Sequence, residues 1–589
     1  MQHPESTGQG LDVGFQCRHL ESISPPGESP SQGPLASMSS RVCDNCICKK
    51  VKCDRGRPTC SRCLTRGETC TYTSIRRKPG PQRGSQHAEL LPNSQRSSES
   101  SATSGRSVSQ EPALEPSIET RGGSPQLRAQ LHVSQQQEEY LIEKFFDIVQ
   151  DANPILSRER FLYRYRNSLC CQDLVSTIVT ITAKLTGFST STDGSGIDAR
   201  IDFLLSSSLL EQDMIGDSPS LDQYRKACLL AFYEFHQFPG HQSWMRIGRL
   251  TRMAYRIGLD RLENLRKLYR EWSVISKEDI QEWRSVWWCI YRLDTYSNIS
   301  SGTPFLIESD LINTSLVMAH SSPSPGGTEA PQELYLPSES EGLWKLLSAL
   351  TSDPETMIMN IHNLTVAATR EAGSVTRSHL LRPQEDTIKR LGDVGRHLSA
   401  LRLALPHGWL NPKRNAFSYE SQADHHARLL TILHLLMAQL LLSISDCDRK
   451  QYDEWLMSWQ RVLEICQDIA SIAEQWNSSF CLKVDPGICF IIFTALIFLD
   501  VHQKSPELPA NQQANIIHDK TVLRLQLEQF ARIWTLPKLL TLSFETFSES
   551  VSGPLSYRQV SIMLSRFEAP LHPRWLQFLS SARVELESC

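Results

Sequence analysis

Apolar side chains recur with helical spacing along most of the chain beyond residue 138. The segment YLIEKFFDIVQDANPIL places four apolar side chains on one helical face: Leu141, Phe145, Ile148 and Val149. We expect Asn153-Pro154 to close this helix. Few runs alternate with a period of two, so the pattern predicts an all-α domain over 138–560. Further amphipathic segments lie at 219–238, 243–259, 277–300, 419–446, 452–476 and 510–535.

Two stretches are apolar enough to be compared with membrane spans. The first, GICFIIFTALIFL over 487–499, is too short to cross a bilayer. The second, over 429–445, is near the lower limit of length and is interrupted by His434 and Gln439. Buried helices of a large all-α domain account for both stretches, and we predict no membrane-spanning segment.

Other parts of the chain carry too few apolar side chains to form a core. Residues 1–40 are rich in Ser, Pro, Gly and Gln, which predicts a disordered tail without a secretory signal. Residues 84–126 contain eleven Ser, so we interpret 74–137 as a linker that is first basic and then Ser/Pro-rich. We expect an exposed insertion between helices over 321–341, which is rich in Ser, Pro, Gly and Glu. The all-α domain is expected to end at residue 560, and 561–589 is assigned as a C-terminal tail.

Six cysteines lie close together between the tail and the linker. They follow the spacing C-x2-C-x6-C-x6-C-x2-C-x6-C, at Cys43, Cys46, Cys53, Cys60, Cys63 and Cys70. Shifting the first three by seventeen positions gives the last three, so the run is an internal repeat. In a chain without a secretory signal, CxxC pairs are more typical of metal ligands than of disulfides.

The number of sulfurs limits how zinc is bound. A structural zinc ion takes four thiolate or imidazole ligands, and the segment contains no histidine. One zinc would leave two thiolates idle, whereas two zincs need eight ligand positions and therefore two bridging sulfurs. We predict two zinc ions. A metal-storing or metal-sensing thiolate protein is the alternative from another class, and it predicts more than two metals and no specific DNA site.

The segment CDNCICKKVKCDRGRPTCSRC resembles the fungal binuclear zinc-cluster DNA-binding domain, here over 41–73. The resemblance implies that Cys43 and Cys60 bridge the two metals. The first zinc would then be held by Cys43, Cys46, Cys53 and Cys60. The second would be held by Cys60, Cys63, Cys70 and Cys43. Pro58 matches the proline of the family in the loop between the halves.

The two halves of the cysteine run differ in charge. Between its second and third cysteines the first half carries Lys49, Lys50 and Lys52, whereas the second half carries only Arg66, beside Glu68. Residues 41–83 contain twelve Lys and Arg against three Asp and Glu, in a chain of net charge −4. We therefore expect the first half to face nucleic acid.

Lysines near the end of a short metal-braced helix can reach the N7 and O6 acceptors of guanine. In the resembled family the matching lysines read CGG-like triplets, which implies base contact by Lys50 first and Lys49 second. Lys52 is interpreted as a phosphate anchor, and Arg55 is grouped with the DNA-binding residues. The simpler alternative is that all of these side chains only anchor phosphates or form a solvated face.

A basic cluster follows the last cysteine. Arg76, Arg77 and Lys78 are a candidate nuclear localisation signal or an arm that contacts the DNA backbone. No heptad repeat follows it, because Leu127, Leu131, Val133 and Leu141 do not maintain the spacing of a coiled coil. A monomer and a homodimer formed through the large domain both stay open.

Part of the helical region resembles the fungal transcription-factor middle homology region, over about 140–320. The resemblance rests on KACLLAFYEFHQ, SWMRIGRLTRMAYRIGLDR and EWRSVWWCIYRLDTYSNISSGTPFLI. The last segment aligns Trp287, Trp288, Asp294 and Gly302-Thr303-Pro304 with the WW, D and GRP signature. Thr303 stands where that signature usually has Arg.

No catalytic motif is present in the sequence. HExxH, P-loop, GxSxG and GxGxxG contexts are absent, so we predict no enzyme and no catalytic residue. Trp at helical spacing is more typical of core than of a ligand pocket, and we apply this to Trp283, Trp287, Trp288 and Tyr291. The seventh cysteine of the segment, Cys48, is interpreted as a packing residue without a metal.

Together these patterns predict a mostly α protein with a small zinc-braced module, a linker and a large helical regulatory domain. We expect a nuclear, sequence-specific DNA-binding regulator of RNA polymerase II genes, whose partners are double-stranded DNA and the transcription machinery or coactivators. The resemblance implies an activator that recognises CGG-like triplets, and we favour a secondary-metabolite gene cluster as its target. A repressor and a nutrient-pathway regulator with the same module are the alternatives.

Overall fold

All regular structure in the described part of the chain is helical, which confirms the predicted fold class. The computed structural model describes residues 42–55, 59–70, 133–188, 195–206, 219–318, 333–414, 420–447, 452–506 and 510–587. The chain divides into two compact units, Met1–Ser117 and Ile118–Cys589. The described helices of the first unit are α1 (Asp44–Cys48) and α2 (Ser61–Leu64).

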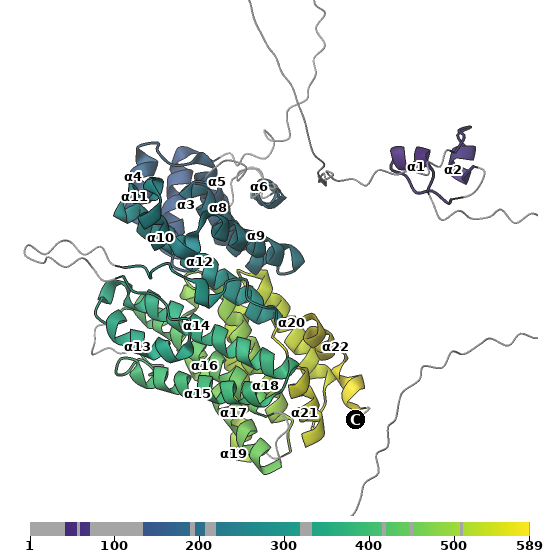
Figure 1. Cartoon of the computed structure of the whole chain (residues 1–589). Helices are drawn as coiled ribbons and strands as arrows, with labels where there is room; N and C mark the ends of the chain where they lie inside the picture. The colour runs from purple at the N-terminus through teal and green to yellow at the C-terminus, as the bar shows by residue number, and fades with distance from the viewer. Residues whose placement is uncertain are drawn as a thin grey trace, which may run out of the picture. The chain divides into compact units, whose positions relative to one another are not determined.

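The second unit is a multi-layered assembly of helices (Figure 1). Its first part contains α3 (Gln135–Ile148), α4 (Arg158–Arg166), α5 (Gln172–Thr186), α6 (Ser195–Ser206), α8 (Leu221–Gln237), α9 (His241–Ile257), α10 (Leu262–Leu268), α11 (Arg270–Ser273) and α12 (Lys277–Ser301). Its second part contains α13 (Ser340–Leu350), α14 (Pro354–Leu381), α15 (Glu385–Ala404), α16 (Gln422–Asp446), α17 (Tyr452–Glu474), α18 (Cys489–Gln503), α19 (Ala510–Ala531), α20 (Thr535–Ser550), α21 (Tyr557–Arg566) and α22 (Pro573–Glu587).

The amphipathic segments of the sequence form helices close to their expected bounds: α8, α9, α12, α16, α17 and α19. The first helix, α3, begins with a capping box in which the Ser134 hydroxyl accepts from the Gln137 backbone N–H at 3.3 Å. It ends at Ile148, before the expected Asn153-Pro154. Leu141, Phe145 and Val149 are buried as predicted, whereas Ile148 is only half-buried.

Helix α12 is the central element of the second unit. It contacts α8 and α9 on one side and α14 on another, and Figure 1 shows it between the earlier helices above and α13–α19 below. Trp287, Trp288 and Tyr291 are almost fully buried, and Trp283 is 7% exposed. These aromatic residues therefore form core, as the sequence predicted.

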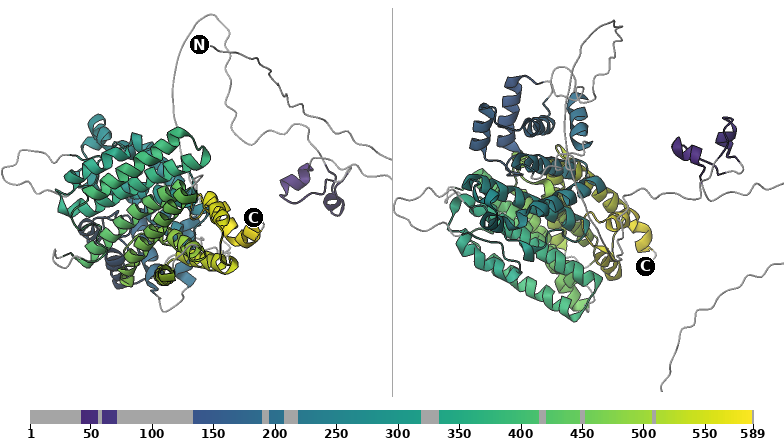
Figure 2. Two further views of the ribbon diagram at one scale, coloured as in Figure 1. Left: turned by 90° about the horizontal axis from the view of Figure 1, so that it is seen from below. Right: turned by 45° about the horizontal axis from the view of Figure 1, so that its top comes forward.

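The two long apolar stretches are core helices of this unit. By length and composition, the stretches Gln422–Asp446 and Pro486–Gln503 are apolar enough to cross a membrane, but 83% and 94% of their apolar windows are buried inside the protein. Helix α16 packs between α14 and α17, and α18 packs against α17 and α19. Figure 2 shows this stack of helices from two further directions.

The end of the chain differs from the expected tail over 561–589. Helix α22 lies in this segment and packs along α20, and the yellow helices of Figure 2 lie against the remainder of the unit. The side chains of Trp575, Phe578 and Leu579 are at most 2% exposed. This segment is therefore part of the packed helical domain, because these apolar side chains reach the core.

A buried ion pair holds the loop that follows α12. The Asp294 carboxylate accepts the backbone N–H groups of Leu306 and Ile307, both at 3.1 Å, and lies 2.9 Å from Nη1 of Arg370 on α14. The Arg370 guanidinium also covers the ring of Phe305, 4.1 Å from its centroid. Arg370 was not identified from the sequence, because it follows Asp294 by 76 positions and belongs to no motif.

Candidate metal centre and nucleic-acid interface

The internal repeat of the sequence is visible in the first unit. Cys43 directly precedes α1 and Cys46 lies within it, while Cys60 directly precedes α2 and Cys63 lies within it. Each CxxC pair therefore spans the first turn of a short helix. These four cysteines are buried, and Cys53 and Cys70 are half-buried.

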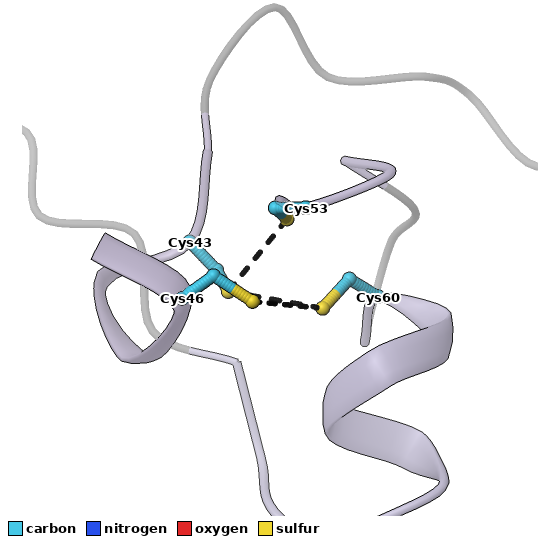
Figure 3. Close-up of side chains that lie close together, drawn as sticks. All are labelled: Cys43, Cys46, Cys53 and Cys60. Carbon is cyan, nitrogen blue, oxygen red and sulfur yellow. Dashed lines mark hydrogen bonds between the residues drawn. The ribbon is translucent and has the colours of Figure 1, made fainter. Parts of the chain in front are cut away.

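The cysteine sulfurs converge on one place (Figure 3). Cys43 Sγ lies 3.8 Å from the sulfurs of Cys53, Cys60 and Cys63, and Cys46 Sγ lies 3.7 Å from that of Cys60. Four thiolates around one zinc at about 2.3 Å are about 3.8 Å apart in a regular tetrahedron. The sulfur spacing therefore fits zinc.

Two overlapping groups of four sulfurs can each hold a metal ion. One group is Cys43, Cys46, Cys53 and Cys60, and the other is Cys43, Cys60, Cys63 and Cys70. Within each group the ligand atoms lie within 4.8 Å of one another. Cys43 and Cys60 belong to both groups, which is the arrangement that two metals and six sulfurs require.

Local contacts support negatively charged sulfurs at this centre. The backbone N–H of Cys60 donates to Cys70 Sγ at 3.2 Å, and that of Arg55 donates to Cys53 Sγ at 3.4 Å. Burial, and after it the contacts with the neighbouring cysteine thiols, raises the pKa of the Cys43 thiol above its usual value. A bound cation is what makes several thiolates compatible with such a buried position.

Cys48 takes no part in either sulfur group. It is the last residue of α1 and is exposed rather than packed, which differs from the interpretation as a packing cysteine. The physical reason is that α1 has only five residues, so only the side facing the sulfurs is covered.

The lysines expected to contact DNA follow the end of α1. Lys50 is exposed and adopts a left-handed backbone conformation with φ 51°, and the backbone N–H of Val51 donates to the Cys46 carbonyl at 3.0 Å. This closes the helix as a Schellman motif, with Lys50 at the position that usually holds glycine. Lys52 and Arg55 are also exposed, and Arg55 has φ 62°.

Lys49 differs from Lys50 because it is paired within the module. Its ammonium group donates to the Glu68 carboxylate of the second half, and this contact lowers the pKa of Glu68. The two side chains are 45% and 35% exposed, so the ion pair lies at the surface. Sequence reasoning assigned Glu68 only to the less basic half and missed this contact.

Some predicted residues lie outside the described part of the chain. These are Pro58 and the basic cluster of Arg76, Arg77 and Lys78.

The first unit is a basic module with two overlapping four-sulfur centres, and the same chain carries a large all-α domain. Together these features define the class of zinc-braced DNA-binding regulators. The chain belongs to the fungal zinc-cluster transcription factors. The family described as "Fungal specific transcription factor domain" matches residues 142–464, and "Fungal Zn(2)-Cys(6) binuclear cluster domain" matches 41–79. The expected middle homology region, about 140–320, falls almost entirely inside the longer match.

Several curated proteins are similar to parts of this chain. "Transcription factor pgmR" of Aspergillus terreus is 39% identical over 64 residues, which are 11% of this chain and 34% of that protein. "Azaphilone cluster-specific transcription factor azaR" of Aspergillus niger is 26% identical over 247 residues, 39% of this chain and 50% of that protein. "Quinic acid utilization activator" of Emericella nidulans is 42% identical over 53 residues, 9% of this chain and 6% of that protein.

The aligned regions thus span at most half the length of these relatives. No solved structure shows significant similarity to the chain. The family and its relatives establish a DNA-binding regulator of transcription with two zinc ions, and they are transcription factors rather than enzymes.

Proposed function

We propose that this protein is a nuclear activator of RNA polymerase II genes that recognises CGG-like triplets. The observation that carries the proposal is the position of exposed Lys50 in the turn that closes α1, where the neighbouring Val51 N–H donates to the carbonyl of the metal-site residue Cys46. A side chain fixed there on a compact scaffold can present its ammonium group to the guanine acceptors in the major groove.

Each part of the first unit has its own role in this mechanism. Cys43, Cys46, Cys53, Cys60, Cys63 and Cys70 would hold the two zinc ions, with Cys43 and Cys60 in both coordination spheres. A unit of this size lacks a hydrophobic core. The zinc ions would hold its two halves together in place of such a core. Lys50 is the first candidate for base contact and Lys49 the second, whereas Lys52 and Arg55 neutralise phosphates.

The target pathway is inferred from the relatives. The name of the Aspergillus niger protein specifies an azaphilone gene cluster, which supports a secondary-metabolite cluster as the target here. The name of the Emericella nidulans protein specifies an activator of quinic acid utilisation, which supports activation and leaves a nutrient pathway as the second candidate.

A selection from random DNA with the full-length protein, combined with a zinc assay, tests DNA recognition. We expect two zinc ions per chain and a consensus that contains CGG. More than two metals without a consensus would support the metal-storing alternative instead. Sedimentation of the complex on the selected site then shows whether one chain or a homodimer binds it.

The direction of regulation needs a reporter gene that carries the selected site. We expect the full-length protein to raise transcription through coactivators, and a Cys60→Ala variant to abolish the effect. A fall in transcription would identify a repressor. Replacing Arg76, Arg77 and Lys78 by Ala in a fluorescent fusion is expected to reduce nuclear accumulation.

A further inference from the structure

A cavity in the helical domain has no role in the proposed DNA recognition. It has a volume of about 660 Å³ and lies among the end of α8, the start of α9, the last turn of α12, α20 and the start of α22. This volume is within the usual range of small-molecule sites, about 300–1,000 Å³. All of its lining residues belong to the described chain.

The cavity walls consist mainly of carbon. Aromatic and leucine side chains provide most of the surface: Phe235, Trp244, Leu536, Leu540, Leu571 and Leu576. No Asp, Glu, Lys or Arg is among the lining residues. Apart from the imidazoles of His241 and His572, the wall offers no titratable side chain. An ionised ligand would therefore lose its hydration without gaining a carboxylate, ammonium or guanidinium countercharge.

Most polar groups of the wall are already hydrogen-bonded within the protein. The Trp244 indole N–H and the Thr303 hydroxyl both donate to the Asn298 side-chain carbonyl, at 3.2 and 2.6 Å. The hydroxyls of Ser300 and Ser301 donate to the Ser297 carbonyl. These groups consequently have few hydrogen bonds left to form with a polar ligand.

A second cavity nearby has the opposite character. It has a volume of about 470 Å³ and shares Thr303 with the first, but its lining includes Arg370, Arg377, Glu371 and Glu568. Glu568 also lies 3.3 Å from the His572 imidazole of the apolar cavity. Arg and Glu side chains therefore line the second cavity, whereas none of them lines the first.

We propose that the apolar cavity binds a neutral small molecule built from an aliphatic chain or aromatic rings and carrying at most one or two hydroxyl groups. Its walls come from segments 235–244, 297–303, 536–543 and 571–576, so the bound molecule joins the early helices to the last ones. Binding of this kind stabilises the folded domain in proportion to ligand concentration. The neutral hydroxyls of the wall, such as Ser543, match a ligand hydroxyl.

The test uses the full-length protein with Nile red, a neutral apolar fluorophore, and two competitors of equal chain length. We expect saturable binding of Nile red and displacement by 1-octanol at concentrations at least tenfold lower than by octanoate at pH 7.5. 1-Octanol should also raise the melting temperature. This measurement contains no DNA, so its outcome does not depend on the proposed function.

Two substitutions on α20 locate the site. Leu539 and Leu542 are 48% and 51% exposed, but only Leu539 lines the cavity. We expect Leu539→Trp to weaken Nile red binding at least tenfold and to abolish the stabilisation by 1-octanol, whereas Leu542→Trp leaves both unchanged. If Leu539→Trp fails to fold, Ser543→Phe fills the same cavity.

Three results would overturn the proposal. They are binding of Nile red without saturation, equal competition by octanoate and 1-octanol, and equal responses of the Leu539 and Leu542 variants. The first result means that no site exists, the second removes the charge selectivity, and the third places the site elsewhere.

Discussion

Lys50 occupies a backbone position that glycine adopts more readily than lysine, with φ 51°. A side chain in this region costs about 1–2 kcal/mol relative to its usual conformation. We therefore expect Lys50→Gly to keep both zinc ions and to leave the module at least as stable. Binding to a CGG site should weaken by about 1–3 kcal/mol, because the base contact is lost. Fluorescence anisotropy with CGG and scrambled DNA measures the change in binding, and a zinc assay measures the metal content.

Lys52→Ala is the control for this substitution. It removes an exposed ammonium group of the same half and should weaken binding to both DNA sequences equally, since phosphate contacts carry no sequence information. If Lys50→Gly also weakened both equally, Lys50 would be a phosphate anchor too.

Glu68 limits the availability of Lys49 for DNA. Exposed ion pairs are weak because solvent screens them, so Glu68→Gln should increase DNA affinity by only a small factor. The gain should be smaller in a Lys49→Ala background, because the pairing partner is then missing. Four titrations, on the parent, both single variants and the double variant, give the coupling energy. Equal gains in the two backgrounds would show that Glu68 acts only by repelling DNA.

The connection between α12 and α14 depends on the Asp294–Arg370 pair. Both side chains are at most 4% exposed, so removal of the cation leaves a buried carboxylate without a countercharge. We expect Arg370→Met to lower the stability of the domain by about 3–5 kcal/mol. The midpoint of urea unfolding, followed by circular dichroism, measures this loss.

Arg390 provides a matched control on the neighbouring helix α15. It pairs with Glu371 at 3.4 Å, but its side chain is 55% exposed. Arg390→Met should change stability by less than about 1 kcal/mol. A comparable loss in both variants would mean that burial of the Asp294–Arg370 pair is unimportant.

Helix α22 contributes to the core although it ends the chain. Trp575 is 1% exposed, and Trp575→Ala should destabilise the domain by about 3–5 kcal/mol. Val584 on the same helix is 72% exposed, so Val584→Ala should change stability by at most about 0.5 kcal/mol. Thermal unfolding of the two variants compares these effects. A melting temperature unchanged by Trp575→Ala would support the original expectation of a tail.

The two units of the molecule obtain their stability from different sources. The first unit has a small buried cluster of Cys43, Cys46, Cys60 and Cys63, whereas the second has an extended core of apolar side chains. We expect a zinc chelator to abolish DNA binding and to unfold only the first unit. Most of the helical circular dichroism and the main thermal transition should persist. Loss of the main transition on chelation would show that the helical domain also depends on zinc.

Contiguous stretches of sequence already determined much of this protein. Cysteine spacing specified the repeat and the two-metal count, because each CxxC pair needs only one helical turn to bring its sulfurs together. Apolar periodicity located α8, α12 and α16, because a face repeats every 3.6 residues within one helix. Family membership followed from these local patterns.

Only the tertiary structure decided which distant side chains meet. Lys49 and Glu68 are 19 positions apart, Asp294 and Arg370 are 76 apart, and the walls of the apolar cavity come from four separate segments. Such contacts depend on the path of the chain between the elements, which no local pattern encodes. The same reason applies to the final helix, because its apolar residues become core only where it packs along α20.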